Sequence, residues 1–113
     1  MRVTSLLENL TYSTDKANVE LLLETEFSKE IRIALKAGQE MKEHKAPFPI
    51  VVEVFDGAIT FGVDGKKHDL KRGDMLTLSG NVPHDLRAAV DSLVRLTLSK
   101  KDQASRVKNV SEK

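Results

Sequence analysis

The chain has 113 residues and a net charge of +1, from 18 basic and 17 acidic side chains. Such a small net charge excludes the strong positive field with which many proteins attract nucleic acid or an anionic membrane. The absence of cysteine excludes disulfides, thiolate metal sites and cysteine nucleophiles.

The N-terminal part, residues 1 to about 28, is mixed in character and carries one apolar cluster, Val19 to Leu23. Its first ten residues lack the uninterrupted apolar run of a signal peptide, because Glu8 breaks it. No stretch of the chain approaches the roughly 18 apolar residues of a membrane span. We therefore expect a cytoplasmic protein without a membrane span, and with no nucleic-acid partner.

The middle of the chain alternates short apolar runs with turn residues, which is typical of β-strands. Ile31, Ile33 and Leu35 occur at every second position. Two Asp-Gly pairs, 56–57 and 64–65, end apolar runs and predict tight turns, because glycine accepts a positive φ. Further strands are predicted at 50–55, 58–63, 66–70, 75–78 and 92–98. At least six short strands at regular spacing predict an all-β sandwich or barrel.

The last thirteen residues, 101–113, are polar and nearly free of apolar side chains. Such a composition predicts a flexible tail, because it cannot bury enough apolar surface to offset the entropy of ordering. The length suits one domain, which we expect over residues 1–100.

Residues 38–88 resemble the two sequence motifs of the cupin superfamily. The first motif is Gly, five residues, His, one, His, three or four, Glu, six, Gly, and its places are occupied by Gly38, His44, Ala46, Ile50 and Gly57. The second motif is Gly, five, Pro, one, Gly, two, His, three, Asn, and its places are occupied by Gly73, Ser79, Asn81, His84 and Ala88. The spacing fits throughout, and one histidine of each motif is retained. The resemblance implies a single-domain cupin, which is a double-stranded β-helix or jelly-roll barrel with its motif core at 38–88.

The resemblance also indicates what has been lost from the usual metal site. In metal-binding cupins three histidines and one glutamate hold a divalent ion inside the barrel, with open positions left for substrate. The resemblance places His44 and His84 at two of these four points, while Ala46 and Ile50 replace the other two ligands of the first motif. A divalent Zn, Ni, Fe or Mn ion on His44 and His84 is therefore expected to be weakly bound or absent.

Three functions remain open at this point. The leading hypothesis is a non-catalytic cupin that binds a small molecule in its barrel. His44 and His84 would be polar anchors among apolar walls, a composition that suits ligand capture; the expected walls are Ile50, Val52, Met75 and Leu96. The alternatives are a metal-dependent isomerase or oxygenase with a reduced two-histidine site, and a structural or interaction protein with a filled barrel. His68 shares a face with Leu70 and is a further candidate for the interior or rim.

The predicted strand at 50–55 is apolar on both faces. Ile50, Val52 and Val54 form one face, whereas Val51 and Phe55 form the other. A strand that is apolar on both sides is usually covered on both sides. Cupins commonly dimerise through this sheet, so the resemblance and the pattern both predict a homodimer.

Overall fold

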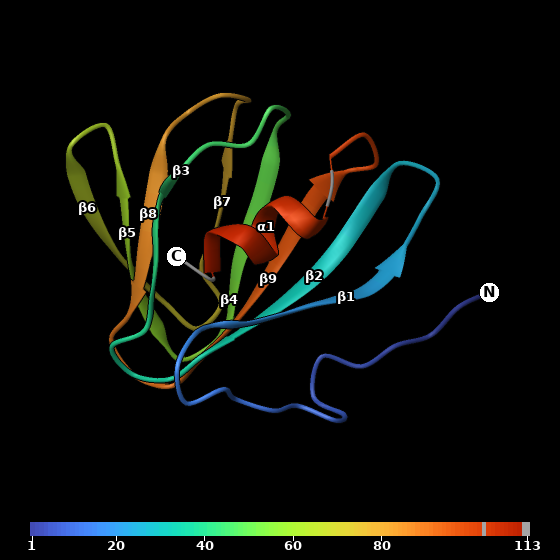
Figure 1. The fold of residues 1–113 in the computed structure, drawn as a ribbon, viewed down its shortest axis with the longest axis horizontal. Coiled ribbons are helices and arrows are strands. Elements are labelled where there is room, and N and C mark those ends of the chain that lie inside the picture. Colours follow the sequence, from blue (N-terminus) through green and yellow to red (C-terminus); the bar gives the residue numbers. More distant parts are fainter. Residues whose placement is uncertain (103, 112–113) are drawn as a thin grey trace.

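The computed structural model describes residues 1–102 and 104–111, which form two antiparallel β-sheets and a short helix (Figure 1). One sheet has the strand order β1-β2-β9-β4-β7 and the other the order β3-β8-β5-β6. The first sheet comprises β1 (Asn18–Glu24), β2 (Ser28–Leu35), β9 (Ser92–Ser99), β4 (Ile50–Asp56) and β7 (Met75–Leu78). The second comprises β3 (Glu40–His44), β8 (His84–Ala88), β5 (Ala58–Val63) and β6 (Lys66–Lys71). This arrangement confirms the predicted all-β jelly-roll class.

The core lies between the two sheets and follows the two-residue period of the strands. The larger sheet contributes alternate side chains of β2, β4 and β9, which are Ile31, Ile33, Leu35, Ile50, Val52, Val54, Val94, Leu96 and Leu98. The smaller sheet contributes Met41, Ile59, Phe61, Leu86 and Ala88. The predicted inward faces of these three strands of the larger sheet are therefore confirmed.

Both predicted Asp-Gly turns are present. The first joins β4 to β5, and Gly57 adopts a φ of +89°. The second joins β5 to β6, with φ values of +54° at Asp64 and +73° at Gly65. Since a side chain is strained in this left-handed region, glycine allows both turns to be tight.

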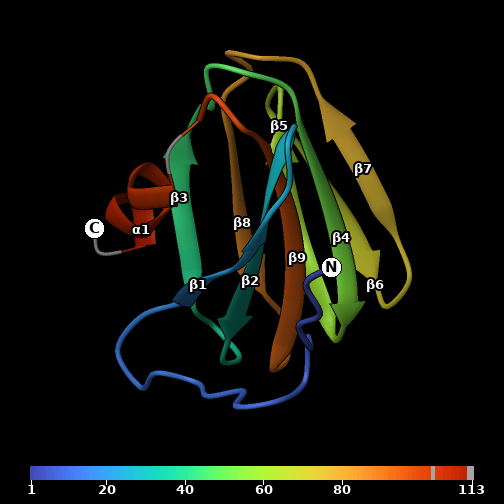
Figure 2. The ribbon, with the colours of Figure 1, turned by 90° about the vertical axis from the view of Figure 1, so that its right-hand side faces the viewer.

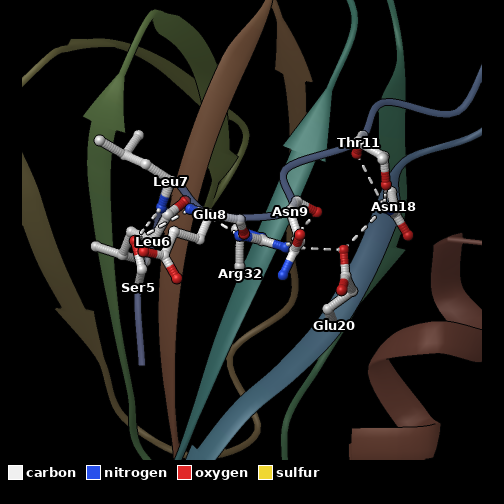
Figure 3. Close-up of polar contacts among 9 residues, drawn as sticks. All are labelled: Ser5, Leu6, Leu7, Glu8, Asn9, Thr11, Asn18, Glu20 and Arg32. Atoms are coloured by element: carbon white, nitrogen blue, oxygen red, sulfur yellow. Dashed lines mark hydrogen bonds and ion pairs between the residues drawn. The ribbon is translucent and has the colours of Figure 1, made fainter. Parts of the chain in front are cut away.

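The first seventeen residues contain neither helix nor strand and cover part of the outer face of the larger sheet (Figure 2). Arg32 of β2 points outward, yet it is only 2% exposed because this segment covers it. Its guanidinium donates to the main-chain oxygens of Leu6, Glu8 and Asn9 at 3.2, 3.0 and 3.4 Å, and pairs with the Glu20 carboxylate at 3.1 Å (Figure 3). We call this set of contacts the Arg32 clamp.

The N-terminal segment also contains Tyr12, the single tyrosine of the chain. Burial raises the pKa of its phenol, and the negative charges of Asp91 and Asp56 raise that pKa further. The segment is thus in contact with the body of the protein at Arg32 and again near these two carboxylates.

The C-terminal region differs from the expected flexible tail. Ala104–Ser111 forms the helix α1, and its Val107 is only 1% exposed. Ala104, Val107 and Val110 are three residues apart and form one apolar face that packs on the core. Three small apolar residues are too few to alter the composition of the segment, so the composition gave no sign of the helix. Residues 103 and 112–113, which were part of the same prediction, lie outside the described residues.

Helix α1 lies across the seam between the two sheets, where it contacts the edge strands β1 and β3 (Figures 1 and 2). Within residues 1–102 and 104–111, no helix has the length and apolar character needed to cross a membrane.

Candidate functional site

The two motif histidines lie side by side. His44 is the last residue of β3 and His84 is the first residue of β8, and these residues pair across the two strands. Their ring centroids are 4.4 Å apart with the planes tilted by 58°. Phe61 of β5 stacks on His84 with the centroids 5.5 Å apart. The strand pairing therefore brings together the two side chains that the motif spacing singled out.

Main-chain carbonyls orient both imidazoles. Nδ1 of His44 lies 2.7 Å from the oxygen of Lys42, and Nδ1 of His84 lies 2.8 Å from the oxygen of Val82. A carbonyl oxygen can only accept a hydrogen bond, so each Nδ1 carries the proton and donates it. In a neutral ring the lone pair then lies on Nε2. Each histidine accordingly offers one acceptor, and the two acceptors belong to adjacent rings.

The environment keeps these rings neutral. Burial lowers the pKa of both histidines from the ordinary value of 6.5, and the nearby positive charge of Arg106 lowers both further. The hydrogen bonds to the carbonyls act in the opposite direction but are outweighed. At neutral pH the pair therefore consists of two uncharged hydrogen-bond acceptors.

A small cavity of about 20 Å³ lies between the sheets beside the pair. A water molecule needs roughly 10–15 Å³ of such volume, so this cavity has room for about one water. Apart from the two histidines and Arg106, its walls are apolar: Ile33, Met41, Ile50, Val52, Phe61, Leu86, Val94, Leu96, Leu98 and Val107.

A second hollow of about 260 Å³ lies on the outside, beside β3 and α1. We call it the vestibule; it is lined by Lys42, Glu43, His44, Arg106, Asn109 and Val110. His44 and Arg106 line both the cavity and the vestibule. These two side chains therefore separate the interior from the surface.

The site residues predicted from the sequence include five of the thirteen residues that line the cavity. Ile50, Val52 and Leu96 line the cavity together with the histidine pair. Met75 is 61% exposed and lies elsewhere, so its assignment to the wall was wrong. The reason is register: Met75 pairs with the outward-facing Glu53, whereas its neighbour Leu76 pairs with Val52. His68 is exposed on β6 and does not reach the cavity.

Two wall residues come from a region in which no ordered structure was predicted. Arg106 and Val107 belong to α1, in the region where a flexible tail was expected. The spacing of Ala104, Val107 and Val110 was the one signal in the sequence that could have indicated a packed helix there.

The residues present do not fit a metal ion held by a protein cage. Ala46 is buried and Ile50 forms part of the cavity wall, so the two places of the first motif that lost their ligands are aliphatic. Among residues 1–102 and 104–111, no group of three or more histidine, cysteine, aspartate or glutamate side chains is placed to hold a metal. Protein metal sites generally use at least three such ligands, and two imidazoles do not meet that requirement.

Comparison with known proteins decides the family. The family model described as "Cupin domain" matches residues 31–99, which is more than half of the chain. The chain belongs to the cupin family. This cupin gave no match among curated protein sequences.

Solved structures resemble this cupin over most of its length. An RmlC-like cupin protein from Desulfovibrio desulfuricans has 29% sequence identity and a TM-score of 0.80, with 88% of this chain and 96% of that chain covered. A protein with a double-stranded β-helix domain from Klebsiella pneumoniae has 20% identity and a TM-score of 0.78, with 92% and 93% covered. The protein TT1209 from Thermus thermophilus has 21% identity and a TM-score of 0.78, with 88% and 98% covered.

Proposed function

We propose that this cupin is a non-catalytic protein that binds a small molecule at the pair formed by His44 and His84. The observation that carries the proposal is the pair itself. Two neutral imidazoles, each with its Nδ1 proton held by a carbonyl, offer unprotonated Nε2 atoms in a setting that is apolar apart from Arg106. Binding pockets commonly combine apolar walls with a few placed polar groups of this kind.

The chemistry of the pair indicates the class of ligand. A hydrogen-bond acceptor beside largely apolar walls favours a ligand that brings an O–H or N–H donor to it, and Nε2 of each histidine is such an acceptor. The surrounding walls suit an apolar body. The ligand is therefore a small, largely apolar molecule that carries at least one hydroxyl or N–H group.

A second function is favoured by the small size of the cavity. About 20 Å³ holds no molecule larger than water while α1 is in place. A cupin with a filled interior that serves as a structural or interaction protein would have such a cavity. The two functions differ in whether any small molecule ever contacts Nε2.

An NMR screen tests the proposal with a library of small apolar compounds that carry hydroxyl or N–H groups. We expect some compounds to shift the Nε2 signals of His44 and His84 while the signal of the exposed His68 stays unchanged. Binding of these compounds, followed on the compounds' own NMR signals, should be lost in a His44→Phe, His84→Phe double variant, which keeps two aromatic rings but removes both acceptors. If no compound moves either Nε2 signal selectively, the filled interior is the better account.

Metal analysis of the purified protein tests the remaining alternative, a metal-dependent enzyme. We expect no stoichiometric Zn, Ni, Fe or Mn, because two imidazoles lack the further ligands that a tight site needs. Near-stoichiometric metal that disappears in a His44→Ala, His84→Ala variant would overturn the proposal in favour of an enzyme.

We further propose that this cupin forms a homodimer through the outer face of its larger sheet. Val51 and Phe55 of β4 lie on that face, together with the exposed Met75 of β7. Arg95 lies on the same face and bonds Glu53 and Glu30 at 2.8 and 2.9 Å, so its positive charge is compensated and the three side chains together carry one net negative charge. Compensated charges beside apolar side chains can be buried against a second copy at less cost than free charges.

A further inference from the structure

We propose that α1 is a lid that opens locally, while the sheets stay folded, and so controls entry to the His44–His84 pair. The inference rests on the proposed function, because that function supplies the small molecule that would enter when α1 opens. The opening of α1 itself can be measured without any ligand. Three features of the helix support the proposal: its position, the way it is held, and its attachment to the sheet.

The position of α1 makes it the outer wall of the cavity. The helix bridges β1 and β3, the edge strands that border one seam of the two-sheet structure. Val107 contributes an apolar wall and Arg106 lies between the cavity and the vestibule. Displacing α1 would therefore join the two spaces and give a ligand access to both imidazoles.

The helix is held by few buried groups. It has eight residues, and helices shorter than about twelve residues are marginal on their own in water. Val107 is the one fully buried residue in the described span 104–110, whereas Ala104 and Val110 are only partly buried. The strands have ladder hydrogen bonds that α1 lacks. Local opening should therefore require less free energy than unfolding of the sheets.

Asp102, two residues before the start of α1, is fixed to the larger sheet. Lys29 of β2 donates from Nζ to the main-chain oxygen of Asp102 at 2.5 Å, and the Asp102 amide donates to Ser99 at 2.9 Å. The buried Asp102 carboxylate accepts two hydrogen bonds from Arg106, at 2.9 and 2.8 Å. Asp102 is thus a fixed end about which α1 can detach, with Arg106 as the first contact inside the helix.

Thiol labelling can measure this opening directly, because the chain has no cysteine of its own. Val107→Cys and Val94→Cys are matched substitutions at sites that are 1% and 0% exposed, one on the lid and one on the central strand β9. We expect Val107→Cys to react at least about 100-fold faster than Val94→Cys under native conditions. Low concentrations of urea should accelerate labelling of Val94→Cys more strongly, since global unfolding exposes more surface than lid opening.

An exposed reference on the same helix, Asn109→Cys, gives the intrinsic rate for a thiol in this environment. Equal labelling rates and equal urea dependence for Val107→Cys and Val94→Cys would overturn the proposal, because α1 would then open only when the whole protein unfolds.

A second measurement leaves the lid unaltered and covers the case in which Val107→Cys itself loosens the helix. In the unmodified chain, the α1 amides should exchange hydrogen far faster than those of β9, with little dependence on urea. If the α1 amides exchanged hydrogen as slowly as the β9 amides, the lid proposal would be wrong even if thiol labelling were fast. A mobile lid with no compound found in the NMR screen would instead refute the binding function alone.

Discussion

At the scale of single residues, the histidine pair couples folding to pH. Burial lowers the pKa of His44 and of His84 in the folded protein. As the pH falls, these histidines are therefore protonated in the unfolded chain before they are protonated in the folded one. Stability should therefore be unaffected by the pair above pH 6.5, the ordinary histidine value, and should fall as the pH drops below it. The prediction is a melting temperature that decreases from pH 7 towards about pH 5.

The same two substitutions used in the ligand screen provide the control. The His44→Phe, His84→Phe variant should show a flatter dependence of melting temperature on pH over this range, because neither ring can be protonated. His68→Gln, at the exposed histidine of β6, should retain the slope of the unmodified protein. An unchanged slope in the double variant would mean that other groups produce the acid sensitivity.

Gly57 is a second residue with a defined energetic role. A Cβ atom there would meet the Ser92 hydroxyl and would lie 2.6 Å from the Asp91 main-chain oxygen, at a φ of +89°. Gly65 has a comparable φ of +73°, but its Cβ would meet nothing within 4 Å. We expect Gly65→Ala to cost about 1 kcal/mol from backbone strain alone, and Gly57→Ala about 3 kcal/mol or more, as measured by urea unfolding. Equal losses would show that the clash relaxes.

Individual residues could be predicted from the sequence where the spacing between motif residues is diagnostic. His44 and His84 could be found because the motif spacing is intact even though half of the motif residues have changed. Met75 was misplaced because a strand of four residues gives too short a pattern to fix which face is inward. The pairing of Met75 with Glu53, which decides the matter, involves residues far apart in sequence.

At the scale of elements, the N-terminal segment depends on the Arg32 clamp. Arg32→Met would keep apolar bulk on β2 while leaving the carbonyls of Leu6, Glu8 and Asn9 without their donor. We expect hydrogen exchange of the amides in residues 6–12 to become much faster, and unfolding free energy to fall by about 2 kcal/mol. Retained protection in this segment would contradict the role of the clamp.

Glu20→Gln is the matched control for the clamp. It preserves an oxygen acceptor 3.1 Å from the guanidinium but removes the negative charge, so its effect on protection and stability should be smaller than that of Arg32→Met. A larger effect would show that charge neutralisation, rather than the main-chain contacts, holds Arg32 in place.

The elements also show where sequence patterns succeed. Strands were predictable because a two-residue period and Asp-Gly turns recur within a few residues of each other. Helix α1 was not, because its order depends on β1 and β3, which lie more than fifty residues away. The same holds for Arg32: its alternation with Ile31 and Ile33 indicates an outward side chain, but nothing local indicates what covers it.

At the scale of the whole molecule, the main open prediction is the homodimer. Sedimentation at micromolar concentration should give a dimer for the unmodified protein and a monomer for Val51→Lys, Phe55→Glu, which places charges on the proposed interface. Lys67→Glu, on β6 of the other sheet, should remain dimeric. A monomeric unmodified protein would overturn the proposed assembly and leave the fold untouched.

The N-terminal segment has one experimental consequence. Because the chain has one tyrosine and no tryptophan, its intrinsic fluorescence comes from Tyr12. That emission reports on the segment held by Arg32 and carries no direct signal from the histidine pair or α1. Fluorescence and far-ultraviolet circular dichroism should therefore give different unfolding midpoints whenever this segment detaches before the sheets separate.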